Sequence, residues 1–284
     1  MKIKKYSNLH RRTFDKSIFY SWEMILVYLL IFINILLMAC VPDIYFAEGS
    51  LQTIIRSGMD LSIMVLGMTF ILVLGEIDVS VASIMILSAM IMGLSYGAGV
   101  PAILAIILGI LAGALCGFIN GFFVSVLRLP SVIVTIATSM LFRGVVRAVL
   151  KDNFLNTFPS FFADISWYDI GGVVPVSMLI FIAFAIIFGI ILHKSTFGRK
   201  LFIIGNSKEV ANYSGIRVNQ TRIIAFVIMG ATAALSSIFF VGRLGGITFS
   251  MGSGYDLKVI AIVVLGGVST LGGKGKLIGP VIST

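Results

Sequence analysis

Two carboxylates and a hydroxyl stand in a short polar segment between two long apolar ones. They belong to Glu76, Asp78 and Ser80, which directly follow Gly75. Acidic side chains near hydrocarbon are costly, usually face protein or a water-filled cavity, and are functional candidates by default. A structural role stays open, in which Asp78 caps a helix that starts at Val79 and Gly75 ends the helix before it. Glu76 and Asp78 are also candidate ligands for a proton or another cation.

Other polar side chains lie in apolar or glycine-rich surroundings. Asn120 is expected to hydrogen-bond between helices. Arg143 lies two helical turns before Lys151 and is expected to pair inside the bundle or to line a cavity, with Asp60 as a candidate partner. The predicted lining of a translocation path is Glu76, Asp78, Ser80, Asn120, Arg143 and Tyr255.

A third group of residues predicts a short helix inside the basic segment 194–222. Asn206 fits the N-cap, Glu209 completes a capping box, and Gly215 fits the left-handed position that ends a helix. A short capped helix between two spans suits contact with a cytosolic partner, and a solvated connector is the alternative. The candidate contact residues are Gly205, Asn206, Glu209, Val210, Tyr213 and Gly215.

The elements that position these side chains are apolar helices. Of 284 residues, 58% are hydrophobic and 12% are charged, whereas a water-soluble domain carries about 25% charged residues. A single soluble globule is therefore excluded. Apolar segments follow one another at 24–41, 53–74, 79–96, 101–126, 132–150, 175–192, 223–241 and 259–271. They predict an all-α polytopic membrane bundle with about eight spans, and because 277–284 begins a further apolar stretch, we expect a C-terminally truncated chain.

The net charge of +9 reports membrane topology. Basic residues gather in 1–22, in 194–222 and at Lys274 and Lys276, whereas the opposite segments hold mostly acids. Because cytoplasmic segments are enriched in Lys and Arg, the N-terminus is predicted to be cytoplasmic. The chain is then a basic tail, 1–22, and one transmembrane domain, 23–284, and no nucleic-acid partner is needed to explain the charge.

Glycine marks two further features. Gly109, Gly113, Gly117 and Gly121 recur at every fourth position, so they lie on one stripe of a helix and let another helix approach closely. Packing within the subunit is favoured over a subunit interface. The run 266–275 is rich in glycine at membrane depth, which predicts a broken helix at a transport path, as does 75–80.

The sequence predicts no cofactor bound by this chain. The glycine-rich run lacks the spacing of a phosphate-binding loop, so ATP and Mg²⁺ must be bound by another chain. The few Cys and His residues do not cluster, so no metal site is predicted. No nucleophile with a neighbouring base supports a membrane enzyme.

Taken in order, these segments resemble the permease subunits of bacterial ATP-binding-cassette importers for ribose, xylose, arabinose, rhamnose and autoinducer-2. The resemblance covers most of the chain from Gly58 on. Glu76 departs from the family pattern, which usually has Gly at this position. The resemblance is carried by residues 75–80, 117–121, 130–135, 143–144, 197–199, 205–206, 214–216, 254–257 and 265–275.

The resemblance implies a permease of about ten spans in the bacterial inner membrane, with two copies or paralogues forming the pathway. Cytosolic ATPase modules would dock on the inner loops, and an extracytoplasmic binding protein would deliver a simple sugar or autoinducer-2. The helix at 206–215 then resembles the coupling helix that receives the ATPase stroke in alternating access. An ion-coupled secondary transporter or channel that uses Glu76 and Asp78 is the competing interpretation.

Overall fold

The computed structural model describes residues 22–284, so positions 1–21 of the predicted basic tail lie outside the described residues. In chain order, the described part forms α1 (Trp22–Cys40), α2 (Pro42–Tyr45), α3 (Ser50–Val73), α4 (Val81–Gly97), α5 (Ala102–Ser125), α6 (Ser131–Leu150), α7 (Phe161–Trp167), β1 (Asp169–Ile170), β2 (Val174–Pro175), α8 (Val176–Lys194), α9 (Thr196–Asn206), α10 (Lys208–Tyr213), α11 (Val218–Leu244), α12 (Tyr255–Leu265) and α13 (Ile278–Ser283). The predicted all-α bundle is confirmed, since the two strands have two residues each.

Five helices of the described chain have the length and apolar composition needed to cross a membrane, namely α3, α5, α6, α8 and α11. The apolar helices at Met24–Cys40 and Val81–Gly97 are shorter. α12 has 11 residues, which at about 1.5 Å per residue is roughly half of the ~30 Å hydrocarbon core. It ends before glycines with left-handed backbone, among them Gly267 and Gly272. The predicted broken helix at 266–275 is confirmed.

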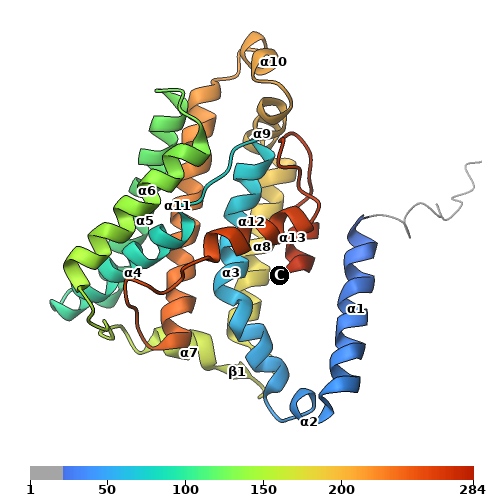
Figure 1. Ribbon diagram of the computed structural model, residues 1–284, viewed down its shortest axis with the longest axis vertical. Helices are drawn as coiled ribbons and strands as arrows, with labels where there is room; N and C mark the ends of the chain where they lie inside the picture. The colour runs from blue at the N-terminus through green and yellow to red at the C-terminus, as the bar shows by residue number, and fades with distance from the viewer. Residues whose placement is uncertain (1–21) are drawn as a thin grey trace, which may run out of the picture.

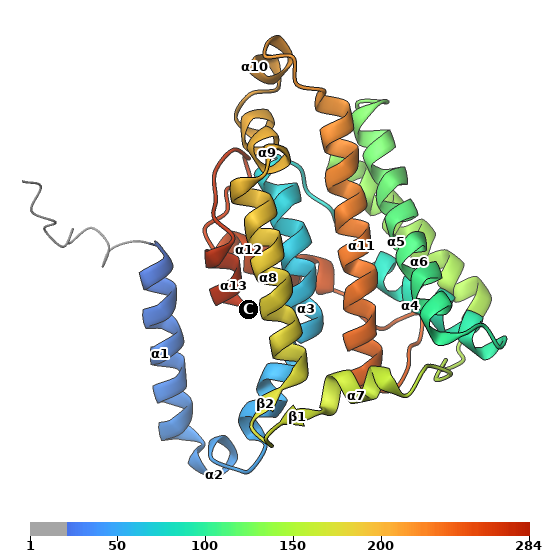
Figure 2. The ribbon, with the colours of Figure 1, turned by 180° about the vertical axis from the view of Figure 1, so that it is seen from behind.

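The core of the bundle is built from α3, α4, α5 and α11 (Figures 1 and 2). Every side chain from Ser62 to Val73 of α3 is buried, as is every one from Val81 to Met90 of α4. Helices that are apolar and buried all round belong to the interior of a bundle. The outer face of α5 and the surrounding helices α6 and α8 expose Leu, Ile and other apolar side chains, as lipid requires.

The glycine stripe of α5 packs inside this subunit, as predicted. The contact between α5 and α11 is the most extensive between helices of the described chain. A methyl group at Gly113 would lie 2.5 Å from the Gly230 carbonyl oxygen, and one at Gly117 would overlap the Phe226 carbonyl. Gly109 meets α4 instead, and Gly121 again meets α11. Backbone contact is therefore what the absent side chains permit.

α1 stands apart from α3 and α8 in both views, contacts α13, and reaches α3 through α2 (Figures 1 and 2). Its Trp22 Nε1 donates a hydrogen bond to the Leu265 carbonyl oxygen at 2.7 Å. Most of its other side chains are exposed Leu, Ile and Phe, a surface suited to lipid.

The two ends of the bundle carry different elements (Figure 1). α9 and α10 lie at one end, and α7 with the antiparallel strands β1 and β2 lies at the other. At the α7 end, Arg56 of α3 forms an ion pair with Asp169 of β1. The α10 end receives the basic segment 194–222 and the break between α3 and α4.

Candidate functional site

The break between α3 and α4 begins at the predicted glycine. Gly75 has a φ of +78°, and its amide donates to the Leu72 carbonyl at 2.9 Å while the Glu76 amide donates to the Ile71 carbonyl at 3.0 Å. This is the left-handed ending of an α-helix, so the predicted role of Gly75 is confirmed. Gly272 packs directly against Gly75, which brings the two helix breaks of the chain into contact.

Asp78, Ser80 and Asn120 form a buried polar cluster at this break. Asp78 Oδ1 accepts from the Ser80 amide at 2.8 Å and from the Ser80 hydroxyl at 2.6 Å. Asn120 Nδ2, from α5, donates to Ser80 Oγ at 2.7 Å, as the predicted bond between helices requires. Asp78 Oδ2 and Asn120 Oδ1 have no hydrogen-bond partner among the described residues. The cluster thus holds two unused acceptors in the interior, where polar atoms are normally paired.

Asp78 accepts the predicted hydrogen bond from the Ser80 amide, but the prediction that it is the N-cap is wrong, because Ser80 holds that position. α4 begins at Val81 and not at Val79. The Val79 amide donates to the Thr135 hydroxyl at 3.1 Å. The Ile77 amide donates to the Ser131 hydroxyl at 3.2 Å. Because two hydroxyls of α6 satisfy these amides, the segment stays non-helical for two residues more than predicted.

Glu76 is bound to different elements. Its Oε1 accepts from Nζ of Lys208, the first residue of α10, at 3.1 Å and from the guanidinium of Arg222 on α11. Glu76 is 5% exposed and Arg222 is 8% exposed. Both partners are far away in the sequence, so residue spacing does not reveal them. The excess of basic residues in 194–222 was the signal that could have indicated a base near Glu76. With two bases bound to it, Glu76 is not a free ligand for a transported cation.

The short helix in the basic segment is present as α10, but its N-cap lies one residue later than predicted. α9 runs through Asn206, whose side-chain amide donates to the Phe202 carbonyl at 3.0 Å. Ser207 has the extended backbone of a cap, and its hydroxyl accepts from the Val210 amide at 3.2 Å. The capping box is therefore wrong, and Glu209 accepts from the Ser207 hydroxyl at 2.9 Å. The pKa of Glu209 is held below its usual value by a hydrogen bond from its own backbone amide and by the one from the Ser207 hydroxyl.

Gly215 ends α10 as predicted, with a φ of +73° and its amide donating to the Asn212 carbonyl at 3.0 Å. Val210 and Tyr213 are 57% and 93% exposed, so α10 presents a partly apolar surface away from the bundle. Gly205 lies on the bundle side, where an added methyl group would overlap the last carbonyl of α3. α9 is thereby held against the helix break, while α10 buries only Ala211 and exposes Val210 and Tyr213.

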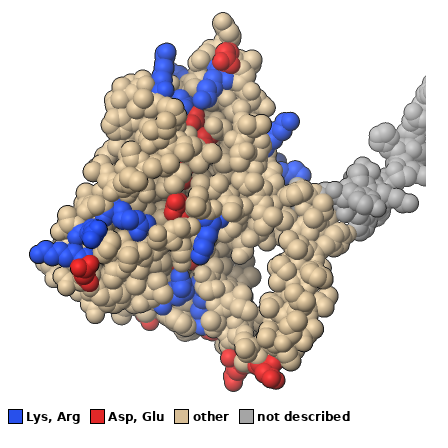
Figure 3. Space-filling view, in the orientation of Figure 1, with Lys and Arg blue, Asp and Glu red and all other residues tan. Residues whose placement is uncertain are grey.

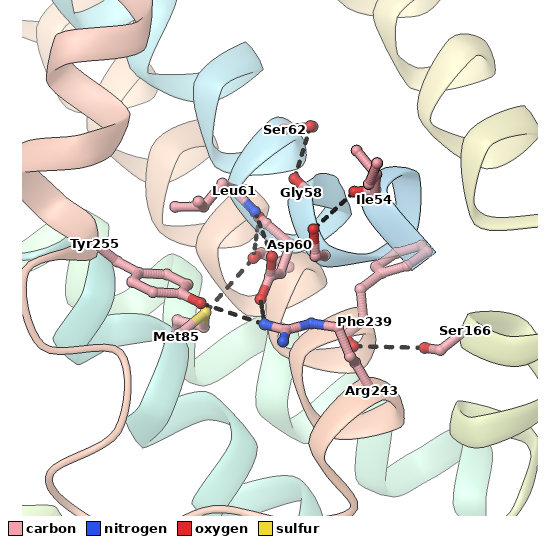
Figure 4. Close-up of polar contacts among 12 residues, drawn as sticks. Ile54, Gly58, Asp60, Leu61, Ser62, Met85, Ser166, Phe239, Arg243 and Tyr255 are labelled. Carbon is pink, nitrogen blue, oxygen red and sulfur yellow. Dashed lines mark hydrogen bonds and ion pairs between the residues drawn. The ribbon is translucent and has the colours of Figure 1, made fainter. Parts of the chain in front are cut away.

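Asp60 pairs with Arg243 and not with Arg143, so the expected pair is wrong. Asp60 Oδ2 accepts from the Arg243 guanidinium at 2.7 Å, and the same guanidinium lies 3.3 Å from the Tyr255 hydroxyl. Figure 4 shows these three side chains converging from α3, α11 and α12. The reason is packing, because α11 lies against α3 whereas α6, which carries Arg143, packs on α4 and α5.

Arg143 bonds to backbone carbonyls inside the bundle. Its guanidinium donates to the carbonyls of Phe249 and Met251 at 2.9 and 3.1 Å, in the segment between α11 and α12. Arg147, one turn further along α6, lies 5.0 Å from the centre of the Phe249 ring. Lys258 of α12 is exposed and lies over the Tyr255 ring at 5.3 Å. Figure 3 shows the side of the molecule that faces the viewer in Figure 1. Charged side chains extend across this face, between large areas without charge.

Comparison with known proteins identifies the family. A family model described as "Branched-chain amino acid transport system / permease component" matches residues 50–284. The autoinducer 2 import system permease protein LsrC of Photorhabdus luminescens is 34% identical over 249 residues, which are 87% of this chain and 74% of that protein. LsrC of Escherichia coli (strain SMS-3-5 / SECEC) is 32% identical and covers 84% of this chain and 69% of its own. This chain belongs to that permease family. No solved structure was found to match it.

The permease brings its predicted path residues together only in part. Asp78, Ser80 and Asn120 meet in one cluster. Tyr255 contacts Arg243, which sequence reasoning missed, and Arg143 contacts the segment before α12. Of the six predicted path residues, Glu76 alone lines the cavity at the α10 end.

A cavity of about 810 Å³ opens at the α10 end of the permease. It lies between the turn that joins α5 to α6, the helix α10 and the start of α11. Among residues 22–284 no group of three His, Cys, Asp or Glu side chains is placed to hold a metal ion. The charged side chains that line the cavity are Glu76, Arg128, Lys208, Glu209, Arg217 and Arg222.

Proposed function

We propose that this chain is the membrane-spanning subunit of an ATP-binding-cassette importer that moves autoinducer-2, or a similar small sugar or polyol, into the cell. The substrate class comes from the relatives, which are named as permeases of autoinducer 2 import systems. The observation that carries the coupling role is α10. This helix stands at the basic end of the bundle, is stopped sharply by Gly215, and exposes Val210 and Tyr213.

The basic end of the bundle is the cytoplasmic one, by the excess of Lys and Arg in its segments. A cytosolic ATPase docks there, around the exposed face of α10, and binds and hydrolyses ATP with Mg²⁺. An extracytoplasmic binding protein delivers the substrate at the α7 end. ATP binding draws the ATPase modules together and α10 follows, which opens the pathway outward in alternating access.

A second copy of the permease, or a paralogue, covers the charged face shown in Figure 3. Arg147 and Lys258 are exposed on α6 and α12, and charged side chains within a membrane are costly in contact with lipid. A second copy placed over α6 and α12 would shield them and enclose a polar pathway beside Arg143. Few polar contacts are needed in this pathway, because the binding protein supplies most of the affinity.

Uptake of labelled autoinducer-2 by cells that lack and then regain this chain tests the proposal. Uptake should depend on the chain, continue after a protonophore collapses the proton gradient, and stop when cellular ATP is depleted. The competing function, ion-coupled transport, rests on the unused oxygens of Asp78 and Asn120. Uptake that stops with the proton gradient while ATP remains would favour that function and contradict ours.

A further inference from the structure

We propose that Glu76 is the positioning residue that transmits the movement of α10 to the helix break between α3 and α4. The inference rests on the proposed function, because it takes α10 as the element that the ATPase moves. It adds the connection from α10 to the interior of the permease.

The geometry places one carboxylate at the meeting point of three elements. Glu76 lies in the break, Lys208 is the first residue of α10, and Arg222 lies one turn into α11. Both bases donate to the same oxygen, Glu76 Oε1. The Lys208 side chain is 48% exposed, whereas those of Glu76 and Arg222 are 6% and 10% exposed. The ion pairs thus connect the exposed start of α10, at Lys208, to the buried side chains of Glu76 and Arg222.

Burial makes this connection hard to break. A carboxylate removed from water is stable only while its partners remain, and taking away a partner of a buried pair is strongly destabilising. When α10 shifts, Glu76 must follow Lys208 or rely on Arg222 alone. α11 is a core helix, held to α5 by backbone contact at Gly113 and Gly230, so we take α10 as the partner that moves.

The break transmits such a shift to the polar cluster. Glu76 is two residues from Asp78, whose carboxylate holds the Ser80 hydroxyl and through it Asn120. The amides of Ile77 and Val79, which flank Asp78, are held by hydroxyls of α6. A displacement of Glu76 therefore changes the positions of groups on α4, α5 and α6 together.

Hydrogen–deuterium exchange tests the connection without a transported substrate. The full-length chain in complex with its ATPase is placed in lipid nanodiscs and compared without nucleotide and with ATP plus vanadate. In the wild type, nucleotide should change exchange both in α10 and in residues 74–82. In Glu76→Gln the change in α10 should persist, while the change in residues 74–82 falls about tenfold, as expected for loss of a coupling energy near 1.4 kcal/mol.

Lys208→Gln gives an independent variant that keeps the buried Glu76–Arg222 pair and so avoids a failure to fold. It should lower the nucleotide-driven change in residues 74–82 about threefold, within the usual range for a coupling residue, and should have no further effect when combined with Glu76→Gln. Glu48→Gln and Lys200→Gln remove exposed charges of the same kinds and should leave the change intact.

The outcomes separate the two proposals. A nucleotide effect on residues 74–82 that survives both Glu76→Gln and Lys208→Gln would overturn the connection while leaving the role of α10 in place. Absence of any nucleotide effect on α10 in the wild-type complex would overturn the proposed function, and with it the connection.

Discussion

The Asp60 carboxylate of α3 is joined to the Arg243 guanidinium of α11 across 2.7 Å, with the Asp60 side chain wholly buried and that of Arg243 21% exposed. The Tyr255 hydroxyl of α12 lies 3.3 Å from the same guanidinium. Three helices, one of them the half-length helix beside the second break, are therefore held at one buried charge. An unpaired buried carboxylate is far less stable than a buried pair, so this contact sets the position of α12.

Arg243→Gln should lower the free energy of unfolding by about 3 kcal/mol, because it leaves the Asp60 carboxylate buried without its counterion. Denaturant unfolding of the purified permease in detergent measures the loss. The double variant Asp60→Asn with Arg243→Gln should recover part of it, since no charge then remains buried. A double variant as unstable as the sum of the two single ones would contradict the pairing.

Gly117→Ala should destabilise the permease by about 2 kcal/mol, because the new methyl group would overlap the Phe226 carbonyl and force α5 away from α11. Gly144→Ala on α6 is the matched control, since a methyl group there meets nothing within 4 Å. Thermal unfolding of the two variants in the same detergent compares them. Equal midpoints would argue against backbone contact between α5 and α11.

Gly215→Val should abolish ATP-driven uptake while leaving membrane insertion intact. The φ of +73° is strained for a β-branched side chain, so the end of α10 must reorganise. Gly215→Asn tolerates this backbone better and should retain most of the activity. Deletion of residues 208–214 should match the valine variant. Undiminished substrate-stimulated ATP hydrolysis in the valine variant or in the deletion would rule out the coupling role of α10.

Arg143→Gln should loosen the segment between α11 and α12, because the carbonyls of Phe249 and Met251 lose their donor. Hydrogen–deuterium exchange of residues 247–253 should rise several-fold, in line with the loss of about 1 kcal/mol for each such bond. Arg147→Gln removes only a contact with the Phe249 ring and should raise exchange less. A larger rise in exchange in Arg147→Gln than in Arg143→Gln would contradict the assigned contacts.

Local chemistry in the sequence predicted the ends of helices well. Gly75 and Gly215 are glycines at positions that require a left-handed backbone, and each ends its helix as expected. The start of α10 was missed by one residue, because Asn206 and Ser207 are both good caps and only Ser207 has the extended backbone of a cap. The glycine stripe of α5 was recognisable because a period of four residues is a property of one helix.

The partners of charged side chains were not predictable in the same way. Arg143 and Arg243 are both basic residues in long apolar helices, and only the packing of α11 on α3 decides which of them meets Asp60. Glu76 likewise has bases from α10 and α11 as partners, and no sequence spacing relates them to the break. Such pairs depend on which helices are neighbours, and a single sequence does not contain that information directly.

The most direct test of the proposed function is uptake of labelled autoinducer-2 into proteoliposomes. These contain the full-length permease with its ATPase, are supplied with the loaded binding protein outside, and carry no ion gradient. The account predicts uptake that requires ATP at the ATPase side and is lost in Gly215→Val. Uptake driven by an imposed proton or sodium gradient in the absence of ATP would contradict it.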